Sequence, residues 1–584
     1  MDKVFGGEIV VRMLANEGVT KVFGIIDGTY FGLYSTFAKY GIEFITPRHE
    51  ACAVHMAAAY ARTTGKLGVC MASNGPGVAN VLPGVAVENC EGNRVLLITS
   101  ARRTGIGYPD RGGAYQYFNA TGVTKAMTKW CGTAPSYDRI PEFMKRAFRI
   151  AWRGRPGVVH VDIPENLMNN KTEIAALPQP ASYRRTTPIV PDPDLVAKAA
   201  EMLTNAELPI IHAGSGVTHA QASEELHAVA KLLHAPVCTS WAGRGAIPEQ
   251  SQLAIPMPYV QLNNQVRNEA DAVLTLGSRI GETDWWGKAP NWRQPGEQRH
   301  IQVDIDEEIL GLNKPVDLAI LGDVKLFLEA LRGVLESKRA GNGHLPKRRD
   351  AVQRFFDIRT KERAKLDQIV NDPKAPLTAA HITKACQERF PEDAYLIIDG
   401  GNTAVWGNFY HEIRTPHTVL ATPKMGMLGA GVAQTLGVKA AHPDRAVYCI
   451  LGDGAFGFNQ QEIETAVRNK LSVVYFVCAD KQWGMVKINQ SFALRPYKTL
   501  IMKALRADET INTDLEEIRY DKLAEAMGAH GERVSQVSEL GPAIDRAMNA
   551  GKPAVVHCDV DPVKHMWAPS LLEFKKMHME PKGK

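Results

Sequence analysis

Two aspartates stand where the chain could bind a metal ion. Asp453 lies in a Gly-Asp-Gly turn directly after the apolar run 446–451, and Asp480 follows a second apolar run, 471–478. A helical pattern over 460–467 separates the runs, which predicts strand, helix and parallel strand. Both carboxylates would then lie at one edge of a sheet, where oxygen ligands suit a Mg²⁺ ion that bridges to a phosphate. A lone Gly-Asp-Gly is usually a plain turn, so this interpretation depends on the rest of the chain.

A third carboxyl group is a candidate for proton chemistry. Glu50 follows a predicted strand at 43–46 and opens an apolar helix over 51–61, where it would be largely desolvated. Burial raises the pKa of a carboxyl group, and an acid that donates a hydrogen bond must keep its proton. The alternative is a glutamate that only stabilises the start of a helix through the helix dipole.

Strands and helices alternate along the whole chain of 584 residues, which is longer than one hydrophobic core supports. We therefore predict an α/β fold of three doubly wound domains with parallel sheets, over residues 1–180, 190–335 and 370–584. A proline-rich stretch over 177–193 predicts the first linker. The second linker, 336–365, is polar and basic, and a solvated helix is a better interpretation of it than an anion site.

Composition excludes several classes of protein. The chain is 45% hydrophobic and 22% charged, and its net charge of +5 reflects 68 basic against 63 acidic residues. This balance is too even to predict nucleic-acid or membrane binding, and no apolar run approaches the length of a membrane span. Nine cysteines without a Cys-x-x-Cys pair, and an N-terminus without a signal-like apolar segment, predict a cytoplasmic protein with reduced thiols.

The Gly-Asp-Gly turn followed by Ala479-Asp480 resembles the fingerprint of thiamin-diphosphate enzymes such as acetohydroxyacid synthase, pyruvate oxidase and pyruvate decarboxylase. The resemblance implies that the side chains of Asp453 and Asp480 and the backbone carbonyl of Gln482 bind Mg²⁺. A carboxylate at position 480 replaces the amide that is usual in the family. It still supplies an oxygen ligand, and its charge should strengthen the attraction for the metal.

The resemblance also implies roles in the first, pyrimidine-binding domain. Glu50 would hydrogen-bond N1′ of the cofactor's aminopyrimidine and promote the imino tautomer that removes the C2 proton. Asn74 and Gly75 lie in a turn that would approach the pyrimidine, and Gln116 is a candidate contact to substrate or cofactor. An isolated glutamine is more often an ordinary surface-loop residue.

The third, diphosphate-binding domain carries the other implied contacts. A set of glycines and neighbouring residues would hold the diphosphate and the aminopyrimidine, with Leu428 as the wedge that bends the cofactor. This set consists of Gly401, Asn402, Thr403, Gly426, Leu428, Gly454, Ala455, Gly484 and Met485. In the family the two domains that enclose one cofactor belong to different subunits, so a homodimer or homotetramer is implied.

The central domain of such enzymes binds FAD or ADP, or is empty. Its glycine turns 214–216 and 277–279, together with Asp304 and Asp306, could hold such a nucleotide, but similar turns also merely close strands. The C-terminal tail, from Met566 onward, could cover the active site or be a frayed terminus.

The substrate is expected to be a small carbonyl compound, processed by making or breaking a bond next to the carbonyl. In detail the chain is most similar to sulfoacetaldehyde acetyltransferase, for example at 23–26, 74–77, 112–116 and 482–490. Three alternatives stay open: a 2-oxo acid decarboxylase or carboligase of the acetolactate synthase type, a 2-hydroxyacyl-CoA lyase or oxalyl-CoA decarboxylase, and a cofactor-binding scaffold without activity.

Overall fold

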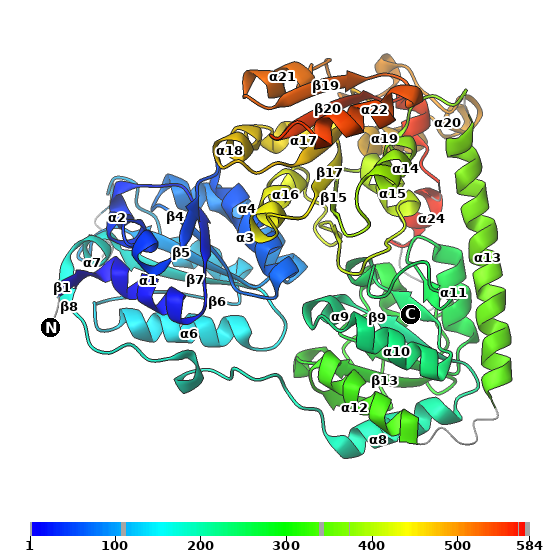
Figure 1. The fold of residues 1–584 in the computed structure, drawn as a ribbon, viewed down its shortest axis with the longest axis horizontal. Coiled ribbons are helices and arrows are strands. Elements are labelled where there is room, and N and C mark those ends of the chain that lie inside the picture. Colours follow the sequence, from blue (N-terminus) through cyan, green and yellow to red (C-terminus); the bar gives the residue numbers. More distant parts are fainter. Residues whose placement is uncertain (1–2, 107–111, 338–343, 373, 570, 579–584) are drawn as a thin grey trace.

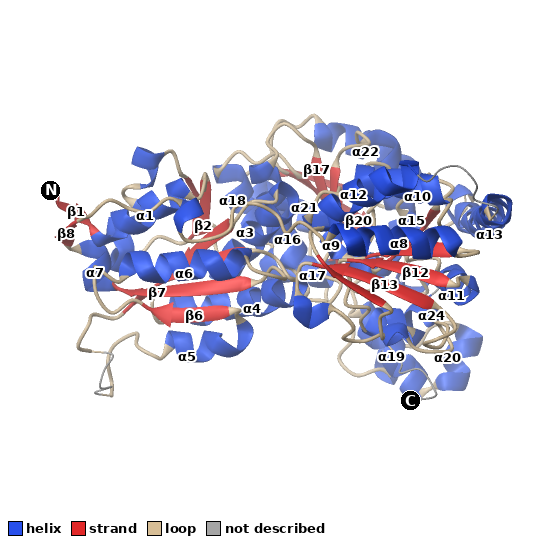
Figure 2. Cartoon of the chain, turned by 90° about the horizontal axis from the view of Figure 1, so that it is seen from below, coloured by secondary structure: helices blue, strands red, loops and turns tan. Residues whose placement is uncertain are grey.

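The chain folds into three parallel sheets of six strands, each flanked by helices (Figures 1 and 2). This computed structural model describes residues 3–106, 112–337, 344–372, 374–569 and 571–578. The architecture confirms the predicted α/β fold of three doubly wound domains. Among the described residues, no helix has both the length and the apolar composition needed to cross a membrane.

The first sheet has the strand order β3-β2-β4-β5-β7-β6, and all its pairings are parallel. Its strands are β2 (Lys21–Gly24), β3 (Glu43–Ile45), β4 (Gly68–Ala72), β5 (Val95–Ala101), β6 (Trp130–Thr133) and β7 (Val158–Pro164). The helices of this domain are α1 (Gly6–Asn16), α2 (Phe31–Tyr34), α3 (Glu50–Thr64), α4 (Pro76–Glu91), α5 (Ala120–Thr124), α6 (Ile140–Trp152) and α7 (Glu165–Asn169). A separate antiparallel pair, β1 (Lys3–Phe5) with β8 (Lys171–Glu173), joins the two ends of the domain.

The central sheet has the order β11-β10-β9-β12-β13-β14 and is also parallel. Its strands are β9 (Pro209–Ala213), β10 (Val237–Thr239), β11 (Ala254–Ile255), β12 (Ala272–Leu276), β13 (Arg299–Asp304) and β14 (Leu318–Leu321). Its helices are α8 (Pro193–Asn205), α9 (Ser215–His219), α10 (Ser223–Leu233), α11 (Val260–Glu269) and α12 (Val324–Ser337).

The third sheet, in the order β16-β15-β17-β18-β20-β19, carries both aspartates of the candidate metal site. Its strands are β15 (Tyr395–Asp399), β16 (Val419–Leu420), β17 (Val447–Gly452), β18 (Val474–Ala479), β19 (His530–Val534) and β20 (Ala554–Asp559). Its helices are α14 (Ala379–Arg389), α15 (Asn402–Tyr410), α16 (Ala430–Ala441), α17 (Asp453–Asn459), α18 (Glu462–Arg468), α19 (Gly484–Leu494), α20 (Pro496–Met502), α21 (Tyr520–Ala526), α22 (Val537–Met548), α23 (Pro562–Met566) and α24 (Leu571–Lys576).

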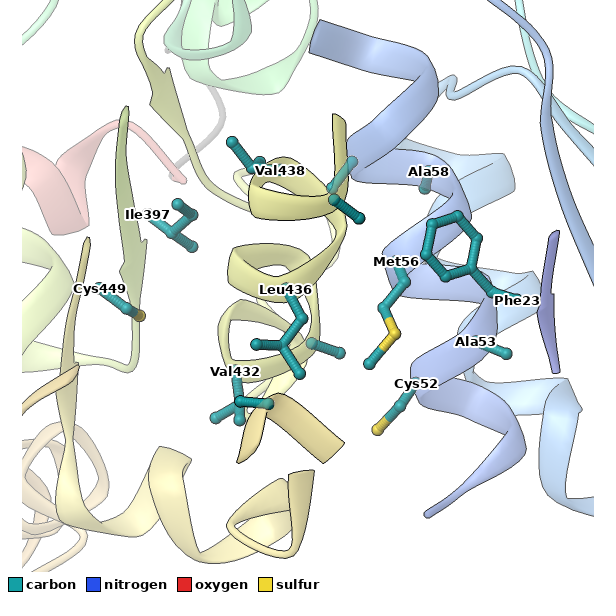
Figure 3. Close-up of a cluster of buried hydrophobic side chains, with 14 of the residues drawn as sticks. Phe23, Cys52, Ala53, Met56, Ala58, Ile397, Val432, Leu436, Val438 and Cys449 are labelled. Carbon is teal, nitrogen blue, oxygen red and sulfur yellow. The ribbon is translucent and has the colours of Figure 1, made fainter. Parts of the chain in front are cut away.

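Helices α3 and α16 join the first and third domains into one core. Figure 3 shows Cys52 and Met56 on α3 facing Val432 and Leu436 on α16. The helices approach so closely that a Cβ atom at Gly437 would lie 2.3 Å from the backbone oxygen of Met56. Only glycine fits at this position, because any larger residue would push the two backbones apart.

The basic linker forms α13 (Leu345–Asn371), which lies along the central and third domains (Figure 1). The helix was predicted, but the prediction of a solvated basic face is wrong for Arg348, which is fully buried. Its guanidinium donates to the backbone oxygens of Leu233 (3.0 Å), Leu203 (3.0 Å), Thr204 (2.9 Å) and Ala206 (2.5 Å). These are the last carbonyls of α8 and α10, which have no partners within their own helices.

Replacing Arg348 with methionine is expected to lower the free energy of unfolding by about 2 to 4 kcal/mol, because it leaves buried carbonyls without donors. Chemical denaturation followed by circular dichroism measures the change. The adjacent exposed Arg349 provides the control: Arg349→Met should change stability by less than about 0.5 kcal/mol. Equal effects of the two variants would contradict this account of the linker helix.

Candidate active site

The carboxyl edge of the third sheet encloses a cavity of about 420 Å³. Strands β17 and β18 pair in parallel, and Asp453 and Asp480 follow them directly, as predicted. The cavity is lined by every residue of the third domain that the resemblance assigned to the diphosphate, the aminopyrimidine or the metal. These are Gly401, Asn402, Thr403, Gly426, Leu428, Asp453, Gly454, Ala455, Asp480, Gln482, Gly484 and Met485. Residues that follow four separate strands of the sheet are therefore gathered around one space.

Asp453 and Asp480 are both buried at the floor of this cavity. Asp453 accepts hydrogen bonds from the backbone N–H groups of Gly454 (2.8 Å) and Lys481 (2.8 Å). Burial raises the pKa of both carboxyl groups, and for Asp480 the neighbouring charge of Asp453 raises it further. Two adjacent buried carboxylates are stable together only when a proton or a cation compensates them, so the pair is suited to a divalent ion.

The donor set suits Mg²⁺ in particular. The side-chain amide of Gln482 donates to Asp480 (3.2 Å) and to the backbone oxygen of Pro562 (2.8 Å), so its side chain is already engaged. The role of its backbone carbonyl as a metal ligand stays a prediction. No group of three or more His, Cys, Asp or Glu side chains in the described ranges could hold a metal ion. A cation here would therefore have two carboxylates and otherwise uncharged oxygen ligands, which magnesium accepts.

An unpartnered amide beside the carboxylates points to an anionic ligand. Both polar atoms of the Asn402 side chain are buried without a hydrogen-bond partner, at the first residue of α15. A helix N-terminus presents free N–H groups that favour a phosphate. A Cβ atom at Gly454 would lie 2.7 Å from the Trp483 ring, and one at Gly484 would lie 2.6 Å from the Asn402 amide nitrogen. The glycines thus keep the backbone open, and the residues fit a diphosphate held through Mg²⁺.

Leu428 lies in a loop that is fixed from both sides. Gly426 and Gly429 have positive φ angles of 61° and 87°, a conformation that favours glycine. The side-chain amide of Asn459 donates to the backbone oxygen of Gly429 (3.0 Å). This arrangement holds the loop with Leu428 at the cavity wall, and the role of Leu428 as a wedge stays a prediction.

Glu50 is buried at the first position of α3, and one of its carboxylate oxygens accepts a hydrogen bond from the Asn80 side chain (3.1 Å). Among the described residues, none of those that line the 420 Å³ cavity comes from the first domain. Glu50 therefore lies outside the cavity formed by its own chain.

The other predicted residues of the first domain, Asn74, Gly75 and Gln116, lie close together at the start of α4. The Asn74 side chain donates to the backbone oxygen of Gln116 (3.1 Å), and a Cβ atom at Gly75 would lie 2.7 Å from the Cβ of Gln116. Gly75 caps α4, which also carries Asn80, the partner of Glu50. Gln116 itself is exposed and adopts a positive φ of 55°.

Comparisons with known proteins agree with this arrangement. The model of the N-terminal domain of thiamine pyrophosphate enzymes matches residues 5–122, that of the central domain matches 196–331, and that of the C-terminal domain matches 399–558. The chain belongs to the thiamine pyrophosphate enzyme family. Thiamine pyrophosphate is another name for thiamin diphosphate.

Relatives of this thiamine pyrophosphate enzyme cover nearly its whole length. A probable acetolactate synthase large subunit of Methanococcus aeolicus is 28% identical over 95% of this chain and 92% of its own. The sulfoacetaldehyde acetyltransferase of Castellaniella defragrans is 29% identical over 93% and 90%. The acetolactate synthase isozyme 3 large subunit of Escherichia coli is 28% identical over 94% and 93%. Relatives named for two different activities are thus about equally similar to this chain.

A second, larger cavity of about 650 Å³ lies where the three domains of this thiamine pyrophosphate enzyme meet. It is lined by the glycine turns predicted for a nucleotide and by Asp304, whose pKa burial raises to about 6. The first domain contributes Arg155 and the third contributes Lys424. Burial, with the charges of Arg279 and Arg155, lowers the pKa of Lys424 to about 7. This cavity is lined by both cationic and acidic side chains.

The C-terminal tail lies against both cavities. Phe574 and His578 line the smaller one, and the Phe574 ring packs edge-on against Trp241 at 5.8 Å between centroids. The His578 imidazole lies 3.5 Å from the Glu282 carboxylate, and Lys575 donates to Asn489. The described part of the tail, as far as residue 578, is therefore packed on the protein.

Two polar contacts of the site had not been anticipated from the sequence. The buried His565 contacts the Thr403 hydroxyl (3.0 Å) and lines the cavity, although it is far away in the chain. Asn80 lies in the segment that contains the predicted glycine turn, but only the packing of α4 on α3 reveals its bond to Glu50. Asn80 is an exposed polar residue of α4, and neither it nor His565 offered a signal in the sequence.

Proposed function

We propose that this protein is a thiamin-diphosphate- and Mg²⁺-dependent enzyme that cleaves or forms a bond next to a carbonyl group, with sulfoacetaldehyde as the leading substrate. The observation that carries the cofactor assignment is the cavity in which the paired carboxylates of Asp453 and Asp480 face the unpartnered amide of Asn402. Bound thiamin diphosphate supplies a carbon nucleophile and an electron sink for the bond beside the carbonyl.

We assign separate roles to the side chains and backbone groups of the site. Asp453, Asp480 and the Gln482 carbonyl hold Mg²⁺, while Asn402 and the N–H groups at the start of α15 bind the diphosphate. Glu50 holds a proton at N1′ of the pyrimidine. Because Glu50 lies outside the cavity of its own chain, we assign it to the cavity of a second copy, which makes the protein a homodimer or a larger homo-oligomer.

The substrate assignment is supported by the motifs shared with sulfoacetaldehyde acetyltransferase and by the residues of the cavity wall. The resemblance implies that Asn489 stands where acetolactate synthases carry a tryptophan that selects their second 2-oxo acid, and that the segment 281–286 covers the place of their arginine. Thr283 of this segment lines the cavity. The 28% identical relatives named acetolactate synthase favour a 2-oxo acid as the second candidate. A CoA ester receives less support, because Arg348 of the basic linker is buried and Lys575 is bonded to Asn489.

The central cavity is the proposed site for FAD or ADP. Its glycine turns and the buried Asp304 suit a ribose and diphosphate, and Arg155 and Lys424 suit the negative charge. Cofactor released from the purified protein by denaturation identifies the nucleotide by its absorption and chromatography.

A donor screen of the purified protein with thiamin diphosphate, Mg²⁺ and phosphate tests the proposed function. Sulfoacetaldehyde should yield sulfite and acetyl phosphate, whereas CO₂ release from pyruvate would favour the acetolactate synthase type. Cleavage of an acyl-CoA would favour the lyase. Protein with Asp453→Asn serves as the control for contaminating activity. A protein that binds the cofactor but converts none of these donors would contradict the substrate assignment.

A further inference from the structure

Helix α18 of the third domain holds the turn that precedes α3 in the first domain. The backbone N–H of Arg48 donates to both carboxylate oxygens of Glu462 (3.0 and 3.1 Å). The Arg468 guanidinium donates to the backbone oxygen of Thr46 (2.7 Å), and Glu464 lies 3.6 Å from the Arg48 guanidinium. We call these contacts of α18 to residues 46–52 the α18 clasp. Figure 1 shows α18 at this boundary between the two domains.

Glu462 is the buried centre of the clasp. Its side chain has no solvent exposure, and the Thr465 hydroxyl donates to it (2.7 Å). Burial raises the pKa of Glu462, while the hydrogen bonds from Thr465, Arg48 and the Cys52 thiol lower it. The carboxylate thus faces the N-terminal end of α3, where N–H donors and the helix dipole favour negative charge.

The clasp fixes the backbone on both sides of Glu50. Glu462 contacts Arg48, His49 and Cys52, which all lie within two residues of Glu50 in the sequence. With Asn80 holding the carboxylate from α4, the position of Glu50 is defined by one contact to its side chain and three contacts to residues within two positions of it. A shift of α18 would therefore move Glu50.

The other end of the same segment reaches the metal site. Helix α17, which precedes α18, begins at Asp453, and Asn459 at its end holds Gly429 beside the wedge residue Leu428. One continuous stretch of chain, 453–468, therefore carries a candidate metal ligand, supports the pyrimidine loop and holds the Glu50 turn.

We propose that Glu462 is a positioning residue for Glu50: it holds the start of α3 so that the Glu50 carboxyl meets the cofactor of a second copy of the chain. This inference rests on the proposed function, because it assumes that Glu50 acts on the cofactor. It also makes α18 a rigid connection between two active sites: the one whose metal ion Asp453 would bind, and the one in the second copy to which Glu50 would contribute its carboxyl group.

The test compares Glu462→Gln with Glu88→Gln. Glu88 is a matched control, since it is equally buried and accepts across the same domain boundary from Gln434 (3.2 Å), yet it does not contact residues 46–52. In Glu462→Gln we expect kcat and the C2 hydrogen–deuterium exchange of bound cofactor to fall together by about tenfold or more, with KM and cofactor Kd nearly unchanged. The Arg48 amide should exchange faster with deuterium in this variant. Glu88→Gln should lower the Tm and leave C2 exchange as in wild type.

Unchanged C2 exchange in Glu462→Gln, together with a faster Arg48 amide, would overturn the inference. If Glu462→Gln does not fold, Glu462→Asp retains the charge but draws it back by one methylene, and its C2 exchange should be slower than that of the wild type. A wild-type rate in a folded Glu462→Asp would overturn the inference. Failure of the proposed function is a different result: wild-type protein would then bind no thiamin diphosphate. In that case the amide exchange of Arg48 still reports whether the clasp holds the turn.

Discussion

Glu50→Gln is expected to lower kcat by about 10²- to 10⁴-fold, the usual contribution of a positioned acid or base. Glutamine has nearly the same size and can still accept from Asn80, so the start of α3 should be preserved. An amide, however, cannot hold a transferable proton at N1′ of the pyrimidine. The measurement is the hydrogen–deuterium exchange of the C2 proton of bound cofactor, followed by quenched-flow NMR, together with the cofactor Kd.

A nearby carboxylate provides the control for this experiment. Glu43 on β3 is exposed and paired with Lys21, so Glu43→Gln changes the charge of the same domain without touching the start of α3. It should leave both C2 exchange and the cofactor Kd unchanged. A wild-type rate of C2 exchange in Glu50→Gln would exclude the proton role and leave Glu50 as a charge that stabilises α3.

Much of the fold followed from local patterns. The apolar runs before Asp453 and Asp480 became the neighbouring strands β17 and β18, because residues buried on both faces of a parallel sheet must be apolar. Glycines at 426 and 454 likewise predicted a backbone that turns or approaches a ligand closely. Because strand ends meet at one edge of a parallel sheet, the order of strands and helices along the chain was enough to predict that Asp453 and Asp480 lie close together.

What the sequence could not predict depends on contacts between distant segments. Arg348 lies in a basic run that looks solvated, and it is buried only because the ends of α8 and α10 present it with free carbonyls. Glu462 looks like an ordinary helical glutamate, and its partner Arg48 is far away in the chain. In both residues the cost of burying a charge is offset by donors or acceptors that only the folded chain brings together.

The second large effect is expected at Asp453. Asp453→Asn should weaken Mg²⁺-dependent binding of thiamin diphosphate by about 100-fold or more, since even loss of a residue that supports a metal ligand costs about 10- to 100-fold. The carboxylate is held by the N–H groups of Gly454 and Lys481, and an amide nitrogen in place of either oxygen would face one of these donors. Quenching of tryptophan fluorescence on titration with the cofactor at fixed Mg²⁺, with Trp483 in the cavity wall, measures the Kd.

Asp480→Asn is the matched comparison and should behave differently. It introduces the amide that is usual at this position in the family and retains an oxygen ligand, so the loss of affinity should be only about tenfold. It also removes a carboxyl group whose ionisation is unfavourable, because burial and then the neighbouring charge of Asp453 raise the pKa of Asp480. The cofactor-free variant should therefore have a higher Tm than the cofactor-free wild type at neutral pH. Equal losses of affinity in the two variants, with no gain in Tm for Asp480→Asn, would mean that the carboxylates do not share one cation.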